Sequence, residues 1–133
     1  MYKIVKVIHF CYGHRLLNYE GLCAHPHGHN GKIEIELASR RLDGRGMVFD
    51  FGEIKEIIQR WVDEALDHKM ILKKGDPLAG VLKKSGEPYF EMNENPTAES
   101  LARLVFNYAR SKKLPISKVT FWETESSRAS YSE

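Results

Sequence analysis

The amino-acid sequence predicts one α+β domain over residues 1–133, in which helices cover one face of an antiparallel sheet. Three observations lead to this fold class. Residues Gly31–Ala38 alternate between apolar and polar side chains, as strands with one buried face do. Residues 51–66 carry apolar side chains at helical spacing. Strand patterns lie toward both ends of the chain and helical patterns in its middle, which favours α+β over alternating α/β architecture.

The first strand is expected over Tyr2–Tyr12, a β-branched and aromatic segment. Its apolar side chains fall mainly on one parity, although Lys6 interrupts that face. A loop over Gly13–Gly21 follows. The Asp-Gly pair within residues 42–46 is a strong hairpin signal, so we expect Met47–Phe49 to form a short returning strand.

Asp50 is expected to begin the first helix because its carboxylate can cap the first turn. Glu53, three residues later, completes a capping box. The helical pattern ends near Asp67–His68. The segment that follows is less regular: Asp76–Leu82 is compatible with a short helix and Pro88–Met92 with a short strand.

Thr97 is expected to cap a second long helix, which ends before Pro115 because the residue before a proline disfavours helix. Lys118–Thr124 and Arg128–Tyr131 then form a final hairpin. Glu123 shares its parity with apolar residues of its strand, where a carboxylate is costly unless it is paired. Either it reaches water at the strand end, or it accepts a two-point hydrogen bond from an amino group beside a ring N–H.

The composition is that of a soluble globular protein, with 42% hydrophobic and 29% charged residues. A net charge of +2 is too small to indicate a nucleic-acid partner. No apolar run approaches the roughly 18 residues of a membrane span, and the N-terminus lacks a signal-peptide core. Two cysteines do not form a disulfide framework, so we expect a reduced, cytoplasmic protein.

The segment Cys23–Asn30 holds three of the six histidines. His27 and His29 would point to one face of an extended strand and could hold one metal ion. His25 has the same parity, so spacing leaves open which of the three bind, and a His-x-His pair alone is more often solvated or hydrogen-bonded. His14 is the nearest further ligand, if Gly13 lets the chain swing it toward the cluster. Three neutral histidines and an open fourth position are the ligand set of a catalytic zinc ion.

Cys23 would lie near such a metal without being needed as a ligand. A cation beside a thiol favours its deprotonation, which suits a base or a nucleophile. The other cysteine, Cys11, belongs to the first strand, where packing is the simpler explanation.

Six segments together resemble the 6-pyruvoyl-tetrahydropterin synthase family, which includes the 6-carboxytetrahydropterin synthases of queuosine biosynthesis. They occur in order over nearly the whole chain: Phe10–Leu16, Cys23–Asn30, Val48–Phe51, Leu66–His68, Asn95–Glu99 and Trp122–Thr124.

This resemblance implies roles for particular residues. His14, His27 and His29 correspond to the zinc ligands, which leaves His25 outside the site. Cys23 corresponds to the catalytic thiol.

The family's other matching positions concern proton transfer and the pterin ring. Asp67 and His68 match the pair that completes the proton-transfer group. Glu123 matches the carboxylate that anchors the pterin ring. Thr97 and Glu99 match positions near the pterin pocket, although a helix cap and a first-turn acid explain them equally well.

The family's fold is the tunnelling fold (T-fold), a four-stranded antiparallel sheet with two helices on one face. Three chains join their sheets into a barrel, and two trimers stack into a homo-hexamer with sites at chain interfaces. Nothing in the residue spacing itself indicates a hexamer.

The resemblance also implies a reaction. Three residues separate Cys23 from His27, a short spacing like that of the 6-carboxytetrahydropterin branch. That branch is a zinc-dependent lyase converting 7,8-dihydroneopterin triphosphate to 6-carboxy-5,6,7,8-tetrahydropterin, with release of acetaldehyde and triphosphate. The alternatives are the pyruvoyl synthase of tetrahydrobiopterin synthesis and a non-catalytic zinc- and pterin-binding module. Arg15, Lys32 and His25 are candidates for the triphosphate by position only.

Overall fold

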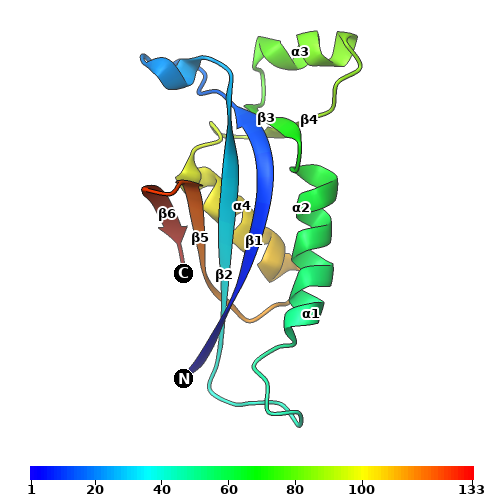
Figure 1. Ribbon diagram of the computed structural model, residues 1–133, viewed down its shortest axis with the longest axis vertical. Helices are drawn as coiled ribbons and strands as arrows, with labels where there is room; N and C mark the ends of the chain where they lie inside the picture. The colour runs from blue at the N-terminus through cyan, green and yellow to red at the C-terminus, as the bar shows by residue number, and fades with distance from the viewer.

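Two long antiparallel strands form the centre of a six-stranded sheet in the computed structural model, which describes residues 1–133 (Figure 1). Strand β1 (Tyr2–His14) pairs with β2 (His27–Ser39) from end to end. On the other side of β2 the sheet continues antiparallel through β5 (Ile116–Thr124) and β6 (Ser127–Tyr131). These four strands are the antiparallel sheet that the sequence predicts.

Two short strands extend this sheet, so the expected count of four strands is wrong. Strand β3 (Lys69–Lys73) pairs parallel with the last three residues of β1, and β4 (Tyr89–Met92) pairs parallel with β3. The sheet is therefore mixed, in the order β4-β3-β1-β2-β5-β6. Ile71 and Leu72 of β3 are both fully buried, so the strand lacks the alternation that marks an antiparallel edge.

The first helix begins where the sequence predicts. The carboxylate of Asp50 accepts hydrogen bonds from the first-turn N–H groups of α1 (Phe51–Ile54). A π-helical segment, Lys55–Gln59, continues α1 into α2 (Arg60–Ala65). The expected strand at Met47–Phe49 does not form: Val48 and Phe49 pack against the core from a loop, and Met47 is exposed.

Two further helices follow. Helix α3 (Pro77–Lys84) is capped by Asp76, and α4 (Ala98–Ser111) is capped by Thr97, whose hydroxyl accepts from the Ser100 N–H. Helix α3 lies beyond the end of α2, away from the main layer (Figure 1). None of the helices has the length and apolar content needed to cross a membrane.

The core fills the space between one face of the sheet and the helices α2 and α4. Trp61 and Tyr108 stack at a ring distance of 4.1 Å and join these two helices. On the opposite face of the sheet, Val5 and Val7 of β1 are exposed. The predicted α+β class, with helices layered on one face, is therefore confirmed.

Both central strands reach further than expected, and this positions the site. Strand β1 continues through Gly13 to His14, so no sharp exit swings that histidine out of the strand. Strand β2 begins at His27, four residues before the expected start. The histidines thus lie within the sheet, where strand pairing fixes their spacing.

Candidate active site

Three histidines meet at the end of the β1–β2 pair. His14 lies directly opposite His27 in the strand register, and His29 lies opposite Tyr12. One ring nitrogen from each of His14, His27 and His29 falls within 4.8 Å of the others. The side chain of His25 is not part of this group. The structure therefore selects three of the four candidate histidines.

Main-chain carbonyl groups fix the orientation of two of these rings. The Nδ1 atom of His14 lies 2.7 Å from the Pro96 carbonyl oxygen. The Nδ1 atom of His27 lies 2.7 Å from the His25 carbonyl oxygen. Because a carbonyl oxygen only accepts, each Nδ1 must carry the hydrogen. Each neutral ring then presents an Nε2 lone pair to the cluster, as a metal ligand requires.

The ring of His29 and the burial of the cluster are also compatible with a bound metal cation. The Nε2 atom of His29 is buried and forms no hydrogen bond. Burial lowers the pKa values of His14 and His29, which keeps both rings neutral and able to bind a metal near pH 7. Three neutral imidazoles without a fourth protein ligand match a catalytic rather than a structural zinc site.

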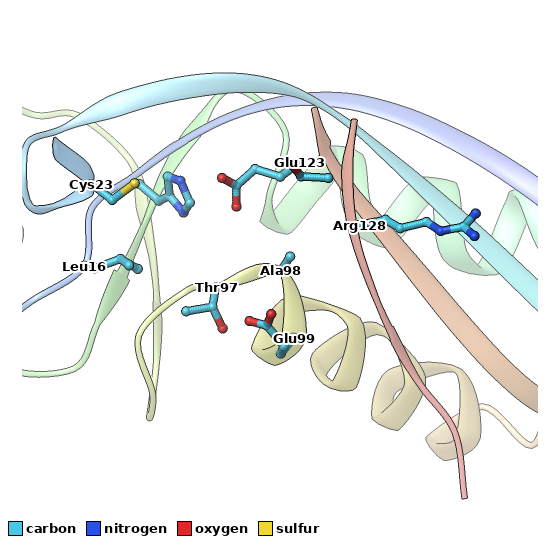
Figure 2. Close-up of a pocket in the computed structure, with 9 residues that line it drawn as sticks. Leu16, Cys23, Thr97, Ala98, Glu99, Glu123 and Arg128 are labelled. Carbon is cyan, nitrogen blue, oxygen red and sulfur yellow. The ribbon is translucent and has the colours of Figure 1, made fainter. Parts of the chain in front are cut away.

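A cleft opens beside the cluster (Figure 2). Nine residues line it: His14, Leu16, Cys23, Thr97, Ala98, Glu99, Glu123, Ser127 and Arg128. Its volume is about 240 Å³, slightly below the 300–1,000 Å³ usual for a complete ligand pocket. One chain thus brings a thiol, two carboxylates and one of the three clustered histidines to a single cleft.

The thiol of Cys23 reaches the cleft from a short turn. Residues Leu22–Ala24 form a 3-10 helix, and the Leu16 N–H donates a hydrogen bond of 2.8 Å to the Cys23 carbonyl. This bond ties the turn to the chain just after His14. The thiol is half-buried, which suits a group that must meet a substrate.

Glu123 lies on the face of its strand that the alternation of side chains predicts. Its side chain is 25% exposed, and its only ion-pair partner is the His29 Nε2 atom at 3.4 Å. Figure 2 shows its carboxylate directed toward the Cys23 side of the cleft. No lysine or arginine neutralises it, so its acceptor atoms are available to a ligand.

Thr97 and Glu99 enter the cleft from the start of α4 (Figure 2). Thr97 uses its hydroxyl oxygen as the helix cap, accepting from the Ser100 N–H at 3.2 Å. Glu99 is exposed and forms no ion pair. Both residues reach the cleft, and the capping role expected for Thr97 is confirmed.

Asp67 and His68 lie elsewhere in the same chain. They line a separate hollow with Cys11 and Asn30 that shares no residue with the cleft. Asp67 accepts from the Cys11 main-chain N–H at 2.9 Å and from the His68 Nδ1–H at 2.6 Å. Burial raises the pKa of Asp67, but these hydrogen bonds outweigh it and leave that pKa below its ordinary value. The pair is well ordered for proton transfer, but it does not meet Cys23 within one chain.

The three residues considered for triphosphate binding all make contacts outside the cleft. Arg15 forms a two-point contact with the buried Asp76. The Lys32 ammonium lies 4.3 Å from the Trp122 ring centroid, and His25 contributes its carbonyl group to His27. None of the three lines the cleft.

The sequence reasoning missed three groups at this site. Ser127 and Arg128 of β6 line the cleft, and the Pro96 carbonyl orients His14. A main-chain acceptor carries no residue-type signal, and only the pairing of β6 with β5 places the first two there.

The chain belongs to the 6-pyruvoyl tetrahydropterin synthase family, which it matches over residues 3–133, and the expected resemblance is confirmed. Among its relatives are proteins named 6-carboxy-5,6,7,8-tetrahydropterin synthase. The protein of that name from Rickettsia bellii is 35% identical over 131 residues, which cover 93% of this chain and 95% of the relative. The one from Haemophilus influenzae is 30% identical over the full length of both chains.

Solved structures show the same fold. An uncharacterized protein from Wolinella succinogenes superposes with a TM-score of 0.80 at 31% identity, covering 99% of this chain and 98% of that one. The 6-pyruvoyl tetrahydropterin synthase of Caenorhabditis elegans superposes with a TM-score of 0.75 at 22% identity, covering 99% and 95%. The second likeness concerns the fold alone.

Proposed function

We propose that this protein is a zinc-dependent lyase that converts 7,8-dihydroneopterin triphosphate and one water molecule to 6-carboxy-5,6,7,8-tetrahydropterin, acetaldehyde and triphosphate. One observation supports this function most directly: three residues separate Cys23 from His27, the first of the paired histidines, and Cys23 lines the same cleft as His14 and Glu123. The names of relatives such as the Rickettsia bellii protein point to the same reaction. The product would serve queuosine biosynthesis, and we expect the enzyme in the cytoplasm.

Glu123, Cys23 and the clustered histidines each have a role in this reaction. The Glu123 carboxylate accepts hydrogen bonds from the pterin amino group and the neighbouring ring N–H. This two-point contact orients the substrate. Cys23, as a thiolate, then takes a proton from the substrate side chain. A zinc ion held by His14, His27 and His29 would supply Lewis-acid chemistry that makes the side-chain hydroxyl groups more acidic.

The proton-transfer pair requires a second chain. Within one chain Asp67 and His68 lie in a different hollow from Cys23, so a neighbouring copy would have to bring its own pair to the cleft. Strand β1 offers an edge for such a neighbour, because β3 pairs only with Tyr12–His14. Strand β6 has no partner beyond β5. These edges would allow sheets of neighbouring chains to join edge to edge, and from the family resemblance we infer that the enzyme is a homo-hexamer, a dimer of trimers.

Product analysis tests the function. The purified zinc-loaded protein is incubated with 7,8-dihydroneopterin triphosphate, and the products are examined by mass spectrometry together with an acetaldehyde assay. We expect the 6-carboxy product and acetaldehyde in equal amounts, and neither from the Cys23→Ala variant. A 6-pyruvoyl product without acetaldehyde would identify the alternative synthase. An unchanged substrate that still binds would identify a non-catalytic pterin-binding module.

A further inference from the structure

A reciprocal pair of hydrogen bonds joins two segments next to the histidine cluster. The Leu17 N–H donates to the Asn95 Oδ1 atom at 2.8 Å, and the Asn95 Nδ2 atom donates to the Leu17 carbonyl at 2.9 Å. The two residues are 78 positions apart in the sequence. The bonds therefore fasten the exit from β1 to the segment that leads into α4.

His14 and Pro96 lie directly beside this fastening. His14 is three residues before Leu17, and Pro96 follows Asn95 in the chain. Both residues are buried, and the Nδ1–H of His14 donates to the Pro96 carbonyl at 2.7 Å. The Thr97 N–H donates to the Asn95 carbonyl at 2.8 Å and closes a tight turn around Pro96, so the place of the Pro96 carbonyl depends on how this turn is fastened to the exit from β1.

We propose that Asn95 is a positioning residue for the metal centre, acting through the Pro96 carbonyl on the ring of His14. By holding that carbonyl in place, Asn95 keeps the hydrogen of His14 on Nδ1 and leaves Nε2 directed at the other two ligands. Asn95 is not a member of the histidine cluster and does not line the cleft. This inference rests on the metal site of the proposed function.

The same fastening sets the start of α4. Thr97, the cap of that helix, comes two residues after Asn95, and Glu99 comes in its first turn. Both line the cleft that adjoins His14. One asparagine thus aligns a metal ligand with the side of the cleft where the pterin ring is expected.

Asn93 offers a matched control. It is two residues earlier in the same segment, has the same side chain, is exposed and forms no side-chain hydrogen bond. Asn95→Ala removes both bonds to Leu17 but keeps the main-chain bond from the Thr97 N–H to the carbonyl of residue 95, so the turn around Pro96 stays closed but is no longer fastened to the exit from β1. Removing a group that orients a histidine ligand typically weakens metal binding by about 10- to 100-fold.

The test compares the wild-type chain with the Asn95→Ala and Asn93→Ala variants. Zinc affinity is measured by competition with a chelator, and the tautomer of His14 is read by nitrogen-15 NMR of the zinc-free proteins. We expect zinc affinity to fall by about 10- to 100-fold in Asn95→Ala and the Nδ1–H signal of His14 to be lost or mixed. We expect Asn93→Ala to match the wild type in both measurements.

A further variant covers the case in which Asn95→Ala does not fold. Asn95→Asp has nearly the same shape and keeps the acceptor for the Leu17 N–H, but it loses the donor to the Leu17 carbonyl. Its added negative charge would by itself attract zinc more strongly. Weaker zinc binding in Asn95→Asp therefore comes from the broken contact with the Leu17 carbonyl, where a donor is lost and two acceptors face each other, and not from the added charge.

The possible outcomes separate this inference from the proposed function. Equal zinc affinity in wild type and a folded Asn95 variant, or an equal loss in Asn93→Ala, would overturn the positioning role. A wild-type chain that binds no zinc would overturn the metal site and this inference together. Tight zinc binding that depends on Asn95, without any lyase activity, would overturn only the proposed reaction.

Discussion

The Nε2 atoms of His14 and His27 face each other across β1 and β2 at 3.0 Å. Each ring already donates its Nδ1 hydrogen to a main-chain carbonyl. In neutral rings, two lone pairs therefore point at each other, an arrangement that no hydrogen bond between them relieves. A cation between these atoms relieves it, so the strand register itself prepares the chain for a metal ion.

The first prediction concerns the metal ligands. His27→Ala removes an Nε2 ligand and should lose zinc and activity together. His25→Ala should keep most of its zinc, because His25 serves the cluster through its carbonyl oxygen, which the substitution leaves in place. Metal analysis of the purified variants measures the zinc content of each. Full zinc content in His27→Ala would show that His27 is not a metal ligand.

The second prediction separates the two cysteines. Cys23→Ala should bind zinc and a pterin analogue but lose turnover by a factor on the order of 10² or more, as expected for a positioned proton-transfer group. Cys11→Ala should be nearly silent, because only the main chain of Cys11 holds Asp67 and His68. Steady-state kinetics decides, and reversed behaviour would show that Cys11 is the reactive thiol.

The third prediction concerns the pterin anchor. Glu123→Gln places an N–H donor where an acceptor is needed, and a charge-assisted bond of this kind is worth about 1.5–3 kcal/mol. Affinity for a pterin analogue should fall roughly ten- to a hundred-fold, while zinc content and melting temperature stay near those of the wild type. Calorimetric titration measures this, with the exposed Glu125→Gln as control. Equal affinity in Glu123→Gln and wild type would place the pterin elsewhere.

The fourth prediction tests the shared site. Cys23→Ala chains and His68→Ala chains should each be inactive alone. After mixing, dissociation and reassembly, some interfaces combine an intact Cys23 from one chain with an intact His68 from another, so part of the activity should return. Mixed chains that stay inactive, although mass spectrometry shows mixed oligomers, would indicate that both groups act within one chain.

The fifth prediction concerns the buried ion pair of Arg15 and Asp76. The Arg15 guanidinium holds the pKa of Asp76 below its ordinary value, so the pair stabilises the fold above the unfolded pKa of about 3.9. This stabilisation is lost as the pH falls through the lower, folded pKa. Asp76→Asn keeps a good helix cap but should cost about 1.5–3 kcal/mol at pH 7.

Urea unfolding at several pH values checks this expectation. The difference between wild type and Asp76→Asn should narrow below about pH 4, where the wild type loses its advantage. Glu64→Gln is the control, because its pairing with Arg60 is exposed and contributes little at any pH. A difference that stays constant with pH would show that the charge of Asp76 is not responsible.

The sequence predicts most of the fold because its long elements carry strong periodic patterns. The alternation of residues 31–38 and the helical spacing after Asp50 both appear in the structure. Strand β3 has no recognisable pattern because it is short and its two buried residues, Ile71 and Leu72, are adjacent. The expectation of a strand at Met47–Phe49 is wrong because a loop can also bury apolar residues, here Val48 and Phe49. Local patterns do not distinguish these cases.

The candidate site was predictable only in part. Strand parity aligned His27, His29 and Glu123 correctly, because parity follows from the backbone alone. The position of Asp67 and His68 was not predictable, since it depends on which edge of β1 the helix returns to. The Pro96 carbonyl is a main-chain group, and only tertiary packing shows that it meets His14.

The length of β1 has a consequence for how the stability of this protein should be measured. Most of that strand, from Tyr2 to Phe10, has a partner on only one side, so a row of main-chain donors and acceptors is open to another chain. Whatever pairs with that edge stabilises the folded state by mass action, and the melting temperature then rises with protein concentration. Variants of this chain are therefore comparable only at matched concentration, and dilution is itself a perturbation as informative as a mutation.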